Sequence, residues 1–466
     1  MEQVITINGE NVGQAINYLT ESAYMGKTIV IACYVNLSNQ IVNLAQKVKL
    51  RFVGGAVLKC AQITGSFTSI DAPITQIFDV AAVSGTWNVS VAYPEWFGAV
   101  SYMRQELEAV SDGYLYNLRF STITFTDSRT AIQQAFDMNV GEVCFSHGFY
   151  FISNTVFCHH SNICINKDAT IFALRQTASN DEFGVMIEAS FVLKNKPREI
   201  FILEMLPMIY GGGCIDGNCE AKIGLELEMG FRVIIKDLVF KNCKYCGLQT
   251  SQTVPHPDPE DETKILYAIG NNYIQDCIFL NEYHYDASGD YQTYAIVNTC
   301  NDSVFTNIEI VDYKIGVFNV GLGASYTNLH AWLPHGCQIS KTAGRITEIT
   351  SVDYNYFWLA SAVIKSPGND VTLISCAADT MRKMLVCESS IFKAHIYNCR
   401  MILNADVVSV AIVNQMPAVV VDNTAVASSV KIIGYYDGYP SGSTPSLFTN
   451  THDGEDGILT CFDSGI

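Results

Sequence analysis

The sequence predicts an all-β protein folded as a parallel β-helix, a solenoid whose coils each contribute short strands. Three observations indicate this fold class. Valine, isoleucine, threonine, tyrosine and phenylalanine recur in short alternating runs, which favours strands over helices. One six-residue pattern returns along the chain at unequal intervals, as in repeat proteins whose loops vary in length. A turn-forming asparagine or aspartate occupies the same place in each copy.

The repeated pattern reads apolar-x-Asp/Asn-apolar-x-apolar. It occurs as IKDLVF at 235–240, IQDCIF at 274–279 and FTNIEI at 305–310, with a weaker copy, YTNLHA, at 326–331. Apolar residues at every second position predict strands with one buried face. Because the pattern itself accounts for the polar residues, we assign turns rather than chemistry to Asp237, Asp276 and Asp312.

A doubly wound α/β fold is the main alternative. It requires a helix of about 10 residues between successive parallel strands. The segment between the first two copies instead contains VPHPDPEDET (254–263), which is rich in proline and acid. The β-helix is therefore the better prediction.

Two short helices are expected to cover open ends of the stack of strands. The segments NVGQAINYL (11–19) and SRTAIQQAF (128–136) both carry apolar residues three and four positions apart and both precede strand-like runs. Asp127 or Ser128 can cap the second helix. A helix laid over a sheet end shields its unpaired edge, so the expected role of both helices is structural.

Composition and charge narrow the possible partners. The 466 residues are 49% hydrophobic and only 16% charged, so the chain can bury a large core. A formal net charge of −18 disfavours nucleic acids and acidic membrane surfaces. The start of the chain does not have the pattern of a signal peptide, and no apolar run reaches membrane-spanning length, so we expect synthesis in a cytoplasm and no membrane insertion.

The 16 cysteines are expected to be reduced and to serve as small core residues, because they are scattered through apolar runs. The pairs Cys243/Cys246 and Cys214/Cys219 have spacings that invite a zinc interpretation, but no histidine pair accompanies them, and we expect no metal and no cofactor. The acidic runs 255–262 and 452–457 could hold calcium, although flexible charged loops explain them better.

Several of these segments together resemble phage tailspike and tail-fibre proteins of the pectate-lyase-like, right-handed parallel β-helix superfamily. The resemblance covers roughly residues 60–335. It is carried by YPEWFGA (93–99), TAIQQAF (130–136), GEVCFSHGFYFISNT (141–155), GCIDGN (213–218) and the coil from 300 to 319 with the following NLHAW. It implies a homotrimer in the virion tail, with other phage tail proteins and a host surface glycan as partners.

In proteins that this chain resembles, a segment like YPEWFGA joins a particle-proximal part to the β-helix. Pro94 fixes the direction of the chain, Trp96 and Phe97 can plug an apolar end, and Gly98 permits a tight approach. Trp96 could alternatively offer a platform for a sugar ring, but its phenylalanine and glycine neighbours favour the plug. We accordingly expect a particle-proximal β region over 1–92, the β-helix over 93–340, and a continuing β-helix or a β trimerisation region over 341–466.

Candidate catalytic residues are carboxylates, because glycan-cleaving enzymes usually place two of them about 5–9.5 Å apart around the scissile bond. Coils stack about 4.8 Å apart, so acids on neighbouring coils can reach this spacing. The loop NEYHYDASGDY (281–291) mixes acids with aromatic rings that suit sugar faces. The predicted catalytic residues are Glu282, Asp286, Asp302 and Glu309, and the predicted glycan-binding residues are Tyr283, Tyr285, Tyr291, Trp332 and His335.

Three functions remain open at this point. The chain could be a tailspike that depolymerises host polysaccharide, a tail protein of the same fold that only adheres or builds the tail, or a secreted bacterial lyase or hydrolase. The YPEWFGA segment and the N-terminus count against the last. A polygalacturonase is disfavoured because only SHG (146–148) and PHG (334–336) approach its Gly-His-Gly motif, and no clustered aspartates and arginine suggest a calcium-dependent pectate lyase.

Overall fold

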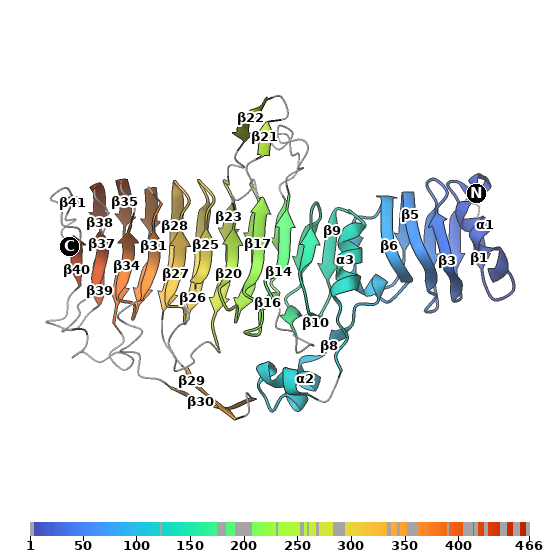
Figure 1. Cartoon of the computed structure of the whole chain (residues 1–466), viewed down its shortest axis with the longest axis horizontal. Helices are drawn as coiled ribbons and strands as arrows, with labels where there is room; N and C mark the ends of the chain where they lie inside the picture. The colour runs from blue at the N-terminus through green and yellow to red at the C-terminus, as the bar shows by residue number, and fades with distance from the viewer. Residues whose placement is uncertain are drawn as a thin grey trace.

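The predicted parallel β-helix is confirmed by the computed structural model. The structure describes residues 4–121, 124–174, 183–191, 207–229, 232–251, 256–258, 261–266, 270–282, 294–332, 337–342, 345–351, 361–368, 370–388, 391–403, 413, 418–423, 427–438, 445–450 and 457–462. Its coils stack into a long rod with the two chain ends at opposite ends (Figure 1). Among the described residues, no helix is both long and apolar enough to cross a membrane.

The N-terminal part of the rod is a small stack of parallel strands of its own. Residues Lys59 and Asp79, one coil apart on two paired strands, form a salt bridge with an Nζ–Oδ2 distance of 2.7 Å on its surface. The first helix lies at the outer end of this stack, as expected of a cap (Figure 1). Its elements are β1 (Val4–Ile7), η1 (Val12–Gln14), α1 (Ala15–Thr20), η2 (Ser22–Tyr24), β2 (Thr28–Ile31), β3 (Val35–Asn43), β4 (Lys49–Phe52), β5 (Leu58–Asp71) and β6 (Phe78–Trp87).

The YPEWFGA segment plugs the junction between this stack and the main β-helix. Trp96 is 4% exposed and donates its indole N–H to the carbonyl of Pro73 at 2.9 Å. Phe97 stacks on Phe78 at 5.5 Å, and Gly98 has a φ of 89°, which favours glycine. The plug is therefore confirmed and burial excludes Trp96 as a sugar platform. The junction comprises β7 (Val91–Ala92), η3 (Pro94–Phe97), β8 (Ser101–Tyr102), α2 (Arg104–Val110), η4 (Leu115–Phe120) and α3 (Arg129–Asp137).

Helix α3 covers the first coil of the main β-helix. Its residues Ala131, Ile132, Ala135 and Phe136 are all buried, as their spacing predicts. Ser128 occupies the N-cap position, but its hydroxyl accepts from the backbone N–H of Val100 rather than from the helix. The carboxylate of Asp127 accepts instead from the N–H of Arg129 at 3.0 Å.

The main β-helix has three faces, and each coil supplies a strand to each. The first and second faces form one continuous sheet, and the third face forms another. The first face contains β9 (Glu142–Phe145), β12 (Asn162–Ile165), β15 (Met208–Tyr210), β18 (Ile234–Lys236), β23 (Tyr273–Gln275), the first halves of β26 (Val304–Val311) and β28 (Ala324–Trp332), β32 (Asp370–Ile374), β35 (Ile391–Tyr397), β38 (Ala427–Ile433) and β41 (Gly457–Phe462).

The second face carries the hollows described below. It contains β10 (Gly148–Ile152), β13 (Ala169–Ala173), β16 (Cys214–Asp216), β19 (Val239–Lys241), β24 (Ile278–Leu280), the second halves of β26 and β28, β33 (Ala377–Asp379), β36 (Arg400–Ile402) and β39 (Tyr436–Gly438). The third face contains β11 (Val156–Cys158), β14 (Val185–Ser190), β17 (Ile223–Met229), β20 (Cys246–Thr250), β25 (Tyr294–Asn298), β27 (Ile315–Asn319), β31 (Ala362–Ser366), β34 (Lys383–Cys387), β37 (Val419–Asn423) and β40 (Ser446–Asn450).

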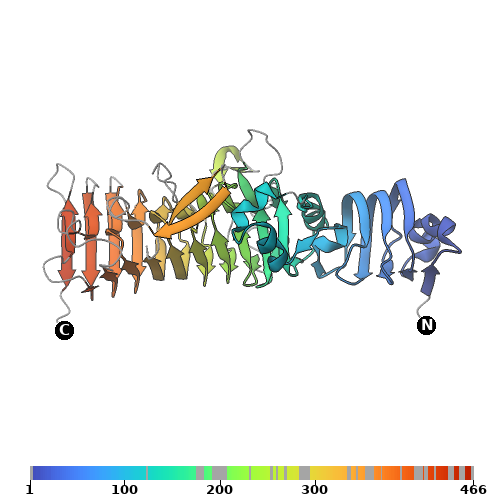
Figure 2. The ribbon, with the colours of Figure 1, turned by 90° about the horizontal axis from the view of Figure 1, so that it is seen from below.

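Two hairpins project from the rod. The strands β21 (His256–Asp258) and β22 (Asp261–Leu266) form one, and β29 (Cys337–Thr342) and β30 (Arg345–Ser351) form the other. The second hairpin runs alongside the coils toward α2 and η4 (Figures 1 and 2). Arg345 at its tip pairs with Asp112, which follows α2. The hairpin and the α2 segment thus meet although they are far apart in the sequence.

The corners between the first and second faces follow the sequence repeat. Asp237, Asp276, Asn307 and Asn328 have φ angles of 56°, 53°, 54° and 52°, in the left-handed region that Asn and Asp tolerate. The Nδ2 of Asn328 donates to Oδ1 of Asn307 at 2.9 Å, and the Nδ2 of Asn307 donates to Oδ1 of Asp276 at 2.8 Å. Asp312 has a φ of 62° at the next corner. The assignment of Asp237, Asp276 and Asp312 to turns is confirmed.

Stacks of like side chains fill the interior. Phe240 lies on Phe279 at 4.8 Å between ring centroids, and Phe305 lies on Tyr326 at 4.7 Å, because each pair occupies the same register position on neighbouring coils. The 14 cysteines whose side chains the structure describes form no disulfide, and most of them are buried, in agreement with their predicted use as small core residues. In the valine- and alanine-rich segment 404–421, the described residues 413 and 418–421 are buried in this chain's own core.

The hydrogen bonds that link the corner residues Asp276, Asn307 and Asn328 give a first testable prediction. Replacing Asn328 by Val should lower the free energy of unfolding by about 1–2 kcal/mol more than replacing it by Gly, because a β-branched residue is strained at positive φ whereas both changes remove the same amide. Denaturant unfolding of the two variants measures the difference. Equal stability of the two would show that this corner can relax to negative φ.

Candidate functional site

The second face contains a groove of about 590 Å³ between its early coils and the α2 segment. The groove has a size typical of ligand sites. Helix α2 supplies Arg104, whose guanidinium bonds Glu108 at 3.0 Å and lies 5.6 Å from the ring of Phe149. The coils contribute the charged and imidazole side chains of His147, Lys167, Asp168, Asp216, Lys241 and Glu282.

Asp216 ends strand β16 and points outward from the second face, in register with Lys241 on the next coil. It is only 5% exposed. Its Oδ1 accepts from the backbone N–H of Asn218 at 2.8 Å and from Nδ2 of Asn242 at 3.3 Å. Burial, reinforced by the nearby Glu282, raises the pKa of Asp216 to about 6, so it holds its proton in mildly acidic solution.

Glu282 lies two coils further along, directly after the corner at Asn281. Its Oε1 pairs with Nζ of Lys241 at 3.0 Å, and its Oε2 accepts from Nδ2 of Asn242 at 3.3 Å. Burial lowers the pKa of Lys241, but the neighbouring Glu282, Cys214 and Asp216 together outweigh burial and leave that pKa raised. Lys241 is therefore a cation that pairs with Glu282.

Asn242 fixes the relation between the two acids. It is fully buried, has a φ of 50°, and accepts the backbone N–H of Glu282 at 2.8 Å through Oδ1. One carboxylate oxygen of Asp216 and one of Glu282 each lie 3.3 Å from its Nδ2, so the two oxygens are separated by no more than twice that distance. This range suits a pair of catalytic carboxylates. Asp216 is buried and has a raised pKa, whereas Glu282 is paired with a lysine, so the two acids lie in different environments, as the two acids of an acid–base pair do.

A second hollow of about 540 Å³ lies further along the second face. Glu309 pairs in register with His330, which pairs with Ala377, and Ala377 pairs with Arg400, so these side chains form one outward column. The ring of His330 stacks on that of Trp332 at 5.6 Å. Burial lowers the pKa of His330, with the charges of Asp379 and Glu309 opposing the shift.

The predicted site residues are distributed over both hollows. Glu282 lines the first hollow and Glu309 the second, while Trp332 is partly exposed beside the second. Asp302 is exposed at a corner with a φ of 52° and lines neither hollow. The other predicted residues, Asp286, Tyr283, Tyr285, Tyr291 and His335, lie outside the described part of the chain.

Sequence reasoning missed Asp216, Lys241 and Asn242 as members of a site. GCIDGN contributed to the resemblance, but its aspartate was not singled out. Nothing in the local sequence marks these three, because their relation to Glu282 depends on the lengths of the intervening loops.

Comparisons with known proteins find similar solved structures only. No protein-family model matches the chain, and no curated protein does. A structure described as ORF18 of Geobacillus virus E2 has a TM-score of 0.42 and 13% identity, covering 80% of this chain and 61% of that one. The gp42 tailspike of Acinetobacter phage vb_AbaP_AS12 has a TM-score of 0.42 and 11% identity, covering 81% and 63%.

A third solved structure is the surface protein and adhesin PfbA of Streptococcus pneumoniae, with a TM-score of 0.35 and 13% identity, covering 80% of this chain and all of that one. The chain thus spans less than two thirds of the length of the two viral structures.

Proposed function

We propose that this chain is a phage tailspike that binds a host surface polysaccharide and cleaves it in the groove of Asp216 and Glu282. The observation that carries the catalytic part is Asn242, whose single amide nitrogen bonds both carboxylates. The assignment to a phage tail rests on the sequence features around YPEWFGA and the β-helix that follows them.

The two acids have different roles in the proposed reaction. Protonated Asp216 donates its proton to the glycosidic oxygen as the bond to the anomeric carbon breaks. Ionised Glu282 either attacks that carbon or takes a proton from the water that attacks it, and the oxygen separation suits the first role or the short end of the second. Lys241 pairs with Glu282, and Asn242 positions both acids.

The second hollow would extend the binding surface along the same face. Trp332 and His330 present stacked rings, a surface that suits the C–H face of a sugar. Glu309 and Arg400 supply hydrogen-bonding groups on either side. Changes at Trp332 should therefore raise KM more than they lower kcat, since this hollow is separate from the proposed chemistry.

The test is to incubate the purified chain with capsular and O-antigen polysaccharides and to assay new reducing ends and the absorbance of unsaturated sugars. Glu282→Gln should lower the cleavage rate by roughly 10²–10⁴-fold, because it removes the nucleophile or base while keeping the shape. Asp302→Asn is the matched control and should cleave at the wild-type rate.

Each outcome of this assay supports or excludes a particular function. Unsaturated products would indicate an eliminative lyase and would contradict the hydrolytic roles given to the two acids. Cleavage that survives in Glu282→Gln would remove the groove as the active site. Binding without cleavage would identify an adhesin, and neither binding nor cleavage would identify a structural tail protein.

A further inference from the structure

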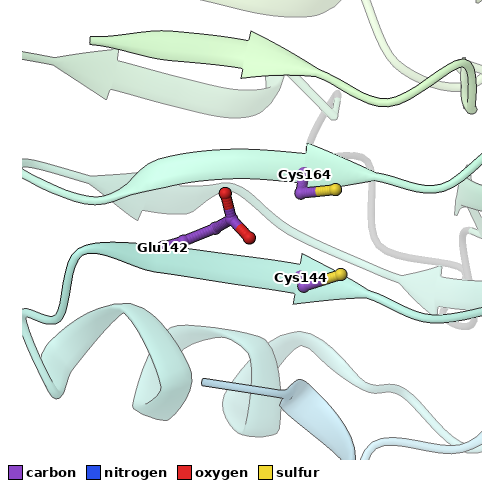
Figure 3. Close-up of side chains that lie close together, drawn as sticks. All are labelled: Glu142, Cys144 and Cys164. Carbon is purple, nitrogen blue, oxygen red and sulfur yellow. The ribbon is translucent and has the colours of Figure 1, made fainter. Parts of the chain in front are cut away.

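A cluster of metal-ligating side chains lies on the first two coils of the main β-helix, outside both hollows. Glu142 and Cys144 are two positions apart on β9, and Cys144 pairs in register with Cys164 on β12. The carboxylate and the two sulfur atoms all lie within 4.8 Å of one another. Figure 3 shows the three side chains on the two neighbouring strands. We propose that Glu142, Cys144 and Cys164 bind a single soft divalent cation such as Zn²⁺.

The strand geometry gathers these groups on one side. Val143 and Phe145, which alternate with Glu142 and Cys144, are fully buried in the core, so the ligands belong to the outward face. The two cysteines are nonetheless only 8% and 7% exposed. The site is therefore close to the surface but shielded, a setting in which a metal can enter and then be held away from competing water.

Neighbouring side chains hold the cluster in place. The hydroxyl of Tyr210 donates to Oε2 of Glu142 at 2.6 Å, which orients the carboxylate. The amide of Asn166 contacts both sulfur atoms, with its Nδ2 3.8 Å from Cys144 and its Oδ1 3.6 Å from Cys164. Such outer contacts typically orient metal ligands.

The donor set selects the class of metal. Two sulfur ligands and one carboxylate favour Zn²⁺ or a similar soft ion over calcium or magnesium, which take oxygen ligands. In a tetrahedral site with Zn–S bonds of about 2.3 Å the two sulfurs are about 3.8 Å apart, so only a small approach of the ligand atoms is needed. Binding releases both thiol protons, and water or the amide oxygen of Asn166 completes the coordination.

The cysteine pairs that first suggested zinc from the sequence lack this arrangement. Within the described part of the chain, no other group of three histidine, cysteine, aspartate or glutamate side chains comes as close together. Cys243 and Cys246 are fully buried in the core. The new cluster has a spacing of 20 residues between its cysteines, which matches one coil of the solenoid rather than a zinc-binding motif.

Cobalt provides a direct probe, because tetrahedral Co²⁺ bound by thiolates has characteristic absorption. The full chain, freed of metal under reducing conditions, should bind one equivalent of Co²⁺ with a thiolate charge-transfer band that Zn²⁺ displaces. Zn²⁺ should also raise the unfolding temperature, since a metal that binds only the folded state stabilises it. Cys33→Ser, which changes a cysteine outside the cluster, should behave like the wild type.

The variants separate a metal site from a mere pair of packed thiols. Cys144→Ser/Cys164→Ser should lose the band and the temperature shift, and Glu142→Gln should keep the band but bind Zn²⁺ at least tenfold more weakly. Circular dichroism checks that each variant is folded. Absence of the band in the wild type, its persistence in the double serine variant, or a Cys144–Cys164 disulfide in freshly purified protein would overturn the proposal.

Discussion

Asp216→Asn is expected to abolish glycan cleavage and, at the same time, to stabilise the protein at pH 7–8. The loss of activity should be roughly 10²–10⁴-fold, because an amide cannot donate the proton that a general acid supplies. The gain in stability follows from burial. In the folded wild type the pKa of Asp216 is about 6, against 3.8 for an unperturbed aspartate, so ionisation favours the unfolded state as the pH rises from 3.8 to about 6, and this cost persists at higher pH.

The direction in which stability changes with pH follows from the raised pKa of Asp216. A carboxyl group with a raised folded-state pKa contributes stability that is complete below pH 3.8 and is lost as the pH rises through about 6. The asparagine variant stays neutral and keeps an oxygen for the N–H of Asn218. At pH 8 its free energy of unfolding should exceed that of the wild type by roughly 1–3 kcal/mol. At pH 5 this difference in the free energy of unfolding should be smaller by roughly 1 kcal/mol.

Denaturant unfolding at several pH values measures the change in stability, and a pH–rate profile measures the change in cleavage. The wild-type cleavage rate should fall above about pH 6, where Asp216 loses its proton. Asp168→Asn, which removes an exposed acid from the same groove, is the control for stability and should show no such pH-dependent gain. A variant that is less stable than the wild type at pH 8 would show that the hydrogen bonds of the ionised Asp216 outweigh the cost of its burial, which would contradict the raised pKa.

Trp96→Ala should lower the free energy of unfolding by about 3–5 kcal/mol, the usual cost of truncating a large buried aromatic residue. Trp96 packs at the junction of the N-terminal stack and the main β-helix, edge-on to Tyr93 at 5.4 Å, and its indole N–H bonds Pro73. The change therefore leaves a cavity and an unpaired carbonyl at the one segment that joins the two stacks.

Because the junction couples two stacks of strands, the variant should also unfold in two transitions where the wild type shows one. Trp96→Phe is the matched control, which keeps most of the volume but removes the hydrogen bond, and it should cost only about 1 kcal/mol. Calorimetry and denaturant curves followed by two probes distinguish the outcomes. A single transition with a loss below 1 kcal/mol for Trp96→Ala would mean that the segment is a connector and not a plug.

The metal proposal is independent of the catalytic one. The first depends on three side chains of β9 and β12, and the second on the acids beside Asn242 two coils further along. An active enzyme with no cobalt band would overturn the metal proposal and leave the catalytic proposal standing. A metal-binding protein that cleaves no glycan would overturn the catalytic proposal and leave the metal proposal standing.

The sequence by itself determined the local structure of each coil. The repeat at 235–240, 274–279, 305–310 and 326–331 sets both the alternation of buried and exposed side chains and the left-handed corners, because these depend on residues close together in the chain. The structure pairs the copies in the register that the pattern implies, with Ile235 beside Ile274 and Phe305 beside Tyr326. The plug formed by Trp96 could be anticipated for the same reason.

Only the tertiary structure decided which polar side chains meet. Asp216, Asn242 and Glu282 come from three successive coils separated by loops of different length, and one residue more in a loop would leave the local pattern intact. Cys144 and Cys164 likewise become neighbours only when β9 pairs with β12. Turns and buried faces are local consequences of chain chemistry, whereas a site on a solenoid is fixed by how its coils stack.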